Sequence, residues 1–261
     1  MEYLRLPLYV LFGILPSLVW LFYYLRKDLH PEPKKMILDV FLYGVLVTIP
    51  VFFVQTQLSE ILKQLQWFDF FHSFPVVVNN ILKWFVVIAF TEEIFKYLVV
   101  KLVVFKNREL DEPLDVILYM IVAALGFAAL ENVLYLFSPI DSLSFQDLFS
   151  TTITISFIRF IGATLLHTLS SGLLGYFLAL SFFNIQRRAA LTVVGLSLAV
   201  ILHGFYNFSI ITLKSPINFI IPVIIILGSA LFLFYAFNRI KKLKGLCKVE
   251  SPFKINPIIK K

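Results

Sequence analysis

Residues 114–137 read LDVILYMIVAALGFAALENVLYLF, an apolar run in which Asp115 and Glu131 are the only charged residues. A helix of roughly 20 residues crosses a hydrocarbon layer of about 30 Å, so this run can span a membrane. The rest of the chain has the same character, since 59% of its 261 residues are hydrophobic, 15% are charged and the mean hydropathy is +0.88. Soluble domains do not reach such values. The sequence therefore predicts a multi-pass integral protein of the cell membrane.

Apolar runs of similar length occupy nearly the whole chain. We expect an all-α fold, a polytopic transmembrane helical bundle of about seven spans. The expected spans are residues 4–25, 36–57, 77–105, 114–137, 151–183, 190–212 and 217–238. The bundle would cover residues 1–238, with residues 77–212 as its motif-bearing core and residues 239–261 as a basic tail.

Lysine and arginine residues are distributed unevenly between the loops. They gather after the first, third and fifth expected spans and in the tail, whereas the opposite loops hold few. Because cytoplasmic loops carry an excess of Lys and Arg, we expect the N-terminus outside and the tail in the cytoplasm. The formal net charge of +7 is then a topology signal, and membrane lipid rather than nucleic acid is the expected contact. The single cysteine, Cys247, excludes an intramolecular disulfide.

Ionisable side chains are unusually frequent inside the expected spans. Such a group costs about 3 kcal/mol or more near the bilayer centre, so it usually faces the bundle interior and has a function. The residues in question are Lys83, Glu92, Glu93, Lys96, Glu131, Arg159, His167 and His203, together with the amides Asn132 and Asn207.

The polar residues fall at helical spacing on four different spans. Residues four apart lie on one face of a helix, so each of these spans presents one polar stripe. The pairs are Glu92 and Lys96, Phe127 and Glu131, His167 and Ser171, and His203 and Asn207. With a rise of about 1.5 Å per residue, the stripes fall in one layer between the middle of the membrane and its outer half. We expect them to meet.

This set of residues suits hydrolysis. Glu92, beside Glu93 and Lys96, suits a general base that takes a proton from water. His203, with Asn207 one turn away, offers donors for a developing oxyanion. Two histidines and a glutamate can instead hold a divalent metal such as zinc with an open position. The candidate ligands are His167, His203 and Glu131, although the sequence contains no HExxH pair.

Three other interpretations stay open at this point. Glu92 or Glu93 with Lys96, and Glu131 with Arg159, could form buried ion pairs that only fix the helix register. Chains of carboxylates and histidines also serve as proton relays in proton-coupled transporters, but no internal repeat supports that function here. The third alternative is a catalytically silent scaffold with the same fold. The sequence contains no signal of oligomeric state.

Four motifs occur in order over about half of the chain. They are Glu92-Glu93-x-x-Lys96, Phe127-x-x-x-Glu131-Asn132, His167-x-x-x-Ser171-Gly172 and His203-x-x-x-Asn207. The ordered set resembles the PrsW family of intramembrane proteases, in the superfamily of the type II CAAX prenyl endopeptidases. The CAAX branch has a histidine where this chain has Glu131, and an arginine one position after Lys96. Prenylated substrates are therefore the less expected match.

The resemblance implies a membrane-embedded peptidase, either glutamate-dependent or metal-dependent, that hydrolyses a peptide bond of a membrane-anchored protein. It implies Glu92 as the base and Asn207 as an amide partner. The remaining site residues that it implies are Glu93, Glu131, His167 and His203. Lys96, Asn132, Arg159 and Ser171 are expected to support them, with Lys96 and Arg159 tuning the charge of the site.

Overall fold

The computed structural model describes residues 5–26, 31–65, 76–107, 110–137 and 145–244, and all regular structure within these ranges is helical. Six helical stretches, with α7 and α8 counted as one, are long and apolar enough to cross a membrane. The expected polytopic helical bundle is thus confirmed. The elements are α1 (Arg5–Leu25), α2 (Lys34–Leu65), α4 (Val76–Ile81), η2 (Leu82–Phe90), α5 (Thr91–Val103), α6 (Pro113–Leu136), α7 (Phe145–Ile161), α8 (Ala163–Phe183), η3 (Ile185–Arg187), α9 (Arg188–Thr212) and α10 (Ile217–Lys244).

Two of the expected spans are irregular. The run expected at 77–105 is a continuous helical path through α4, η2 and α5, and η2 is π-helical. The run expected at 151–183 is broken at Gly162, whose backbone dihedrals (φ −106°, ψ −93°) leave the helical region. π-Helical segments are frequent at functional sites. Both irregularities adjoin residues that the sequence predicts for the site, because η2 ends just before Glu92 and the break follows Arg159.

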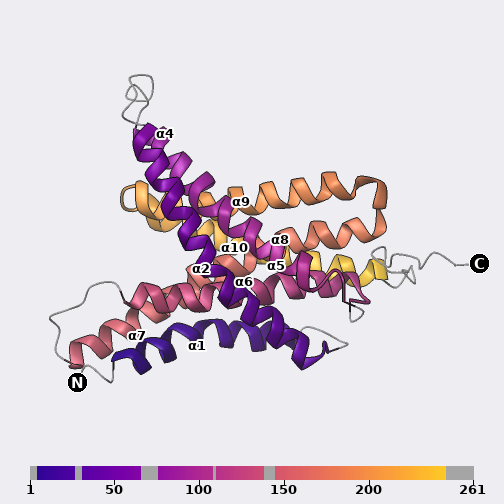
Figure 1. Ribbon diagram of the computed structural model, residues 1–261, viewed down its shortest axis with the longest axis horizontal. Helices are drawn as coiled ribbons and strands as arrows, with labels where there is room; N and C mark the ends of the chain where they lie inside the picture. The colour runs from indigo at the N-terminus through magenta and orange to yellow at the C-terminus, as the bar shows by residue number, and fades with distance from the viewer. Residues whose placement is uncertain (1–4, 27–30, 66–75, 108–109, 138–144, 245–261) are drawn as a thin grey trace, which may run out of the picture.

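Helix α6 forms the centre of the bundle. Nearly all of its side chains are buried, and it packs against α1, α2, α5 and α8 (Figure 1). Its N-terminus is defined by a capping box in which the Glu112 backbone N–H donates to Asp115 at 2.7 Å, with Pro113 in the first turn. Glycines let its neighbours approach closely. A Cβ on Gly126 would overlap the Phe41 carbonyl oxygen of α2.

The other helices surround α6. Helices α8 and α9 run side by side and are joined through η3, while α1 and α7 lie together on another side of the bundle (Figure 1). Helix α10 covers α8 and α9 and continues to Lys244, six residues beyond the expected span end. Residues 245–261, most of the predicted basic tail, lie outside the described residues. The predicted orientation of the termini in the membrane stays a prediction.

Replacement of Gly126 by alanine tests the close approach of α2 and α6. The added methyl group meets backbone that cannot rotate away, so Gly126→Ala should destabilise the fold by about 1–3 kcal/mol. The matched control is Gly228→Ala in α10, where an added Cβ has nothing within 4 Å. Thermal unfolding of the detergent-solubilised protein measures both. Equal unfolding temperatures for the two variants would contradict the close packing.

Candidate active site

Helix α5 turns Glu92, Glu93 and Lys96 into the bundle, where their exposed fractions are 4%, 0% and 0%. The Lys96 ammonium nitrogen lies 2.9 Å from Glu93 Oε1 and 3.4 Å from Glu92 Oε2. It also lies 2.8 Å from His167 Nδ1. An ammonium group has three N–H donors and no acceptor. These three contacts therefore use all of its donors.

The partners of Lys96 and Glu131 define the tautomer of His167. Because the ammonium can only donate, His167 Nδ1 is the acceptor. The Nε2–H of the same ring then donates to Glu131 Oε2 at 2.7 Å. Arg159 Nη2 lies 3.0 Å from the same oxygen, and Arg159 Nε donates to Asn132. One chain of polar contacts thus connects α5, α8, α6 and α7.

Glu93 lies deeper in the bundle than these polar contacts and binds the second histidine, His203. It is fully buried and accepts from Ser170 Oγ at 3.1 Å, from Ser171 Oγ at 2.8 Å and from Lys96. His203 Nδ1 is 2.9 Å from Glu93 Oε1. Since this carboxylate already receives an ammonium and two hydroxyls, it is the acceptor and Nδ1–H is the donor. The Nε2 atom of His203 is thereby turned toward Glu92.

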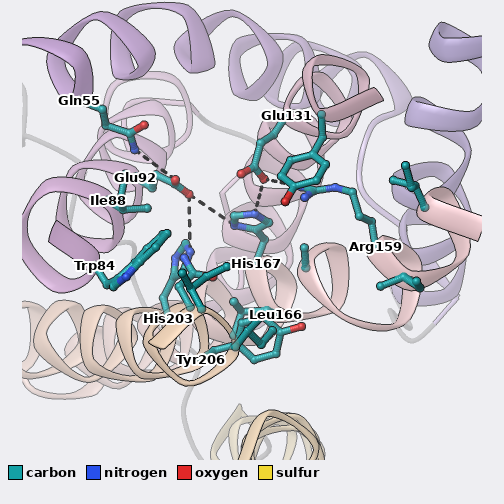
Figure 2. A pocket seen from close by; sticks show the side chains of 17 residues that line it. Gln55, Trp84, Ile88, Glu92, Glu131, Arg159, Leu166, His167, His203 and Tyr206 are labelled. Atoms are coloured by element: carbon teal, nitrogen blue, oxygen red, sulfur yellow. Dashed lines mark hydrogen bonds and ion pairs between the residues drawn. The ribbon is translucent and has the colours of Figure 1, made fainter. Parts of the chain in front are cut away.

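Glu92 stands at the wall of a cavity of about 460 Å³. Its Oε1 accepts from Gln55 Nε2 at 3.2 Å. Its Oε2 is 3.7 Å from His167 Nδ1 and 3.7 Å from His203 Nε2. Figure 2 shows the carboxylate and the two imidazole rings pointing toward one another from α5, α8 and α9. The described residues bring the sequence-predicted stripes together inside the bundle.

The ten residues predicted for the site divide into two groups. Six line the cavity, and four lie buried behind its wall and hold the others. The first group is Glu92, Glu131, Arg159, His167, His203 and Asn207, and the second is Glu93, Lys96, Asn132 and Ser171. Their catalytic and supporting roles stay predictions. The ion pairs that would fix the helix register are also present, between Lys96 and Glu93 and between Arg159 and Glu131.

Sequence reasoning missed Gln55, Ser170 and Tyr206. Gln55 holds Glu92 from α2, and Ser170 holds Glu93. The signal for Gln55 is an amide near the end of an otherwise apolar run, which would have to face the interior of the bundle. Tyr206 follows His203 by one helical turn, so it shares the face that lines the cavity.

A divalent metal was one of the two options left open by the sequence. Glu92, His167 and His203 offer three ligand atoms within 4.8 Å of one another, a set that suits catalytic zinc in kind and number. Glu131, the expected third ligand, instead accepts from His167 and Arg159.

The position of the Lys96 ammonium disfavours metal binding, however. The lone pair of His167 Nδ1 is directed at the Lys96 ammonium, which also lies 3.4 Å from Glu92 Oε2. A metal ion would share both atoms with an existing positive charge, and like charges in a low-dielectric interior repel strongly. The residues as arranged therefore do not fit a metal, because Lys96 already supplies the cation.

The amino-acid sequence matches the model of a family described as PrsW family intramembrane metalloprotease over residues 32–236. The Protease PrsW of Oceanobacillus iheyensis is 28% identical over 82% of this chain and 88% of its own length. The Protease PrsW of Bacillus subtilis strain 168 is 29% identical, with the same coverage of 82% and 88%. That of Clostridioides difficile strain 630 is 26% identical over 78% and 79%. No solved structure is significantly similar to the chain.

Removal of the buried ammonium tests its central position. The Lys96→Met change keeps a long unbranched side chain but leaves Glu92 and Glu93 without their cation. Breaking a buried ion pair in this way costs about 3–5 kcal/mol. Lys101→Met, on the exposed side of the same helix, is the control and should change stability little. Thermal unfolding in detergent compares the two, and a Lys96→Met protein as stable as the control would refute the assignment.

Proposed function

Because this chain belongs to the PrsW family of intramembrane proteases, we propose that it hydrolyses a peptide bond of a membrane-anchored protein, with Glu92 as the general base. The resemblance inferred from the four motifs is confirmed by this membership, as is the placement in the cell membrane. The observation that carries the proposal is that Glu92, His203 and Asn207 line one cavity inside the bundle.

Glu92 is oriented to accept a proton. Gln55 holds its Oε1, which leaves Oε2 facing the imidazoles of His167 and His203. Both 3.7 Å distances exceed a direct hydrogen bond, and one water molecule beside such a pair can contact the carboxylate and an imidazole together. Glu92 takes a proton from this water, and the hydroxide adds to the carbonyl carbon of the substrate peptide bond.

With both histidines neutral, the site has one more negative than positive charge, so it can take up one further proton. Three carboxylates face one ammonium group and one guanidinium group in an apolar surrounding, where a net charge is costly. One protonated histidine would neutralise the set. The carboxylates belong to Glu92, Glu93 and Glu131, and the cations to Lys96 and Arg159.

His203 is the histidine that suits this proton. His167 Nδ1 accepts from Lys96 and so cannot be protonated without losing that bond. His203 Nδ1, in contrast, donates to the Glu93 carboxylate, so a proton on its Nε2 breaks no existing hydrogen bond. Its Nε2–H then points to the cavity, and Asn207 offers a second donor one turn away. Together they stabilise the oxyanion that forms when the hydroxide adds.

The second half of the reaction returns the proton. The tetrahedral intermediate collapses, the bond between its carbon and the amine nitrogen breaks, and Glu92 gives its proton to that nitrogen. The products are a new carboxyl end and a new amino end, and Glu92 is again a carboxylate. Glu131 and Arg159 position His167 at the opposite wall of the cavity in this mechanism. No step requires a metal.

Loss of the base tests the mechanism directly. The protein is reconstituted in liposomes with a panel of tagged proteins that each contain one transmembrane helix, and cleavage is followed on gels. Glu92→Gln should lower the cleavage rate by about 10²–10⁴, the usual contribution of a general base. His203→Ala should lower it by about 10²–10³ through loss of an oxyanion donor. Glu60→Gln, on the exposed part of α2, is the control and should cleave normally.

The outcomes of this experiment separate the proposal from its alternatives. Cleavage that survives both Glu92→Gln and His203→Ala would exclude the assigned roles. A wild-type protein that cleaves no member of the panel would favour a silent scaffold.

The metal content tests the role assigned to Lys96. Wild-type protein exposed to zinc and then dialysed should hold far less than an equimolar amount, and 1,10-phenanthroline should leave cleavage unchanged. The Lys96→Met variant frees the ligand atoms of Glu92, His167 and His203, so it should retain zinc that the wild type does not. Elemental analysis of both proteins measures this. Equimolar zinc in the wild type, with loss of cleavage on chelation, would overturn the glutamate mechanism.

A further inference from the structure

A second, apolar hollow of about 340 Å³ adjoins the cavity of the site. It lies between the end of α7, the α9 helix and the first half of α10, and we name it the lateral groove. Ile158, Tyr206 and Ile210 line both the lateral groove and the catalytic cavity. A ligand in the groove would therefore lie next to the cavity that contains Glu92 and His203.

The lateral groove faces the lipid side of the bundle. Val223 of α10 is 56% exposed and Ile158 of α7 is 58% exposed, so both present apolar surface outward. In a membrane this surface meets acyl chains or the apolar segment of another protein. The groove is thus a place where a membrane-embedded segment can lie beside the cavity without leaving the apolar layer.

One polar atom in the lateral groove is not explained by the fold. Asn218 lines the groove, and its Oδ1 is buried with no hydrogen-bond partner among the described residues. A buried polar atom without a partner costs about 1–3 kcal/mol. A ligand in the groove that carries an N–H group would supply the missing donor.

We propose that the lateral groove binds the transmembrane segment of the protein substrate in an extended form, next to the bond that is cut. This inference rests on the proposed function and adds the place and shape in which the substrate binds. The peptide groups of a helix are engaged in its own hydrogen bonds. A segment must therefore unwind before water can attack one of its carbonyl carbons. Unwinding exposes backbone N–H groups that lack partners in an apolar medium. Asn218 Oδ1 accepts one of them.

The helix break at Gly162 lies at the boundary between the groove and the cavity. A Cβ at this position would lie 2.6 Å from the Tyr206 hydroxyl oxygen and 2.9 Å from the Ile158 carbonyl oxygen. Both of these residues form the boundary between the two hollows. The absence of a side chain at Gly162 therefore leaves room for the Tyr206 hydroxyl group beside α7.

Disulfide crosslinking locates the substrate independently of cleavage. The experiment uses full-length protein with Cys247→Ser and Glu92→Gln, so that the only cysteine is an introduced one and bound substrate is not consumed. Val223→Cys places a thiol in the groove. Ile224→Cys, the next residue and 62% exposed, places one on the same helix outside the residues that line the groove. Each member of the single-helix panel carries one cysteine at successive positions along its apolar segment.

The expected result is a disulfide at Val223→Cys with substrate positions beside the cleavage point, formed about tenfold more readily than at Ile224→Cys. Equal or absent crosslinking at the two sites, while the wild type cleaves the same panel, would overturn the groove and leave the proposed function standing. Crosslinking confined to Val223→Cys without wild-type cleavage would support the groove and overturn the proposed function.

Two further variants give a kinetic readout. Val223→Trp fills the groove and should lower kcat/KM, while the matched Ile224→Trp should not. Asn218→Leu removes the acceptor and should lower kcat/KM by about tenfold, the effect expected from one lost hydrogen bond to a backbone N–H. Asn218→Gln, which keeps an amide acceptor, should restore part of the loss. Unchanged kcat/KM in both Val223→Trp and Asn218→Leu would refute the groove as the substrate site.

Discussion

The Lys96 ammonium lies inside an apolar bundle, where a positive charge with no partner would cost several kcal/mol. This cost is offset by contacts with Glu92, Glu93 and His167, which come from two different helices. These contacts help to orient the two histidines. The bond to His167 Nδ1 directs the opposite ring nitrogen to Glu131, and neutralisation of Glu93 lets that carboxylate hold His203. The geometry of the site thus depends on one buried cation.

This polar network can form only because the helices around α6 approach one another closely. Gly126 meets the backbone of α2, and Gly175 of α8 lies against the Ile117 backbone of α6, with an added Cβ only 2.8 Å from its Cα. Close approach of α8 to α6 brings His167 within 2.7 Å of Glu131. Side chains larger than glycine at these positions would separate the helices by more than a hydrogen bond tolerates. Small residues in the apolar core are therefore a condition for the polar site.

The sequence predicted the bundle and the convergence of the site because both follow from simple rules. Apolar runs of membrane length give the spans, and charged residues inside them must face the interior. The spacing of four residues then defines the faces of Glu92, His167 and His203. Gln55 and the bond between Lys96 and His167 were not predicted, since they depend on how far each helix is rotated and shifted. The break at Gly162 is a local backbone choice that apolar composition does not record.

The adjacent Glu92 and Glu93 show how one motif supplies two functions. Consecutive residues on an α-helix point about 100° apart, and here only Glu92 of the two carboxylates lines the cavity. Glu92 faces the cavity and has Gln55 as its holding partner, whereas Glu93 is fully buried and has four donors. A carboxylate with four donors is a poor base, because its lone pairs are occupied. In the proposed mechanism, the attacking water therefore gives its proton to Glu92, and Glu93 contributes by holding His203 in the orientation that faces the oxyanion.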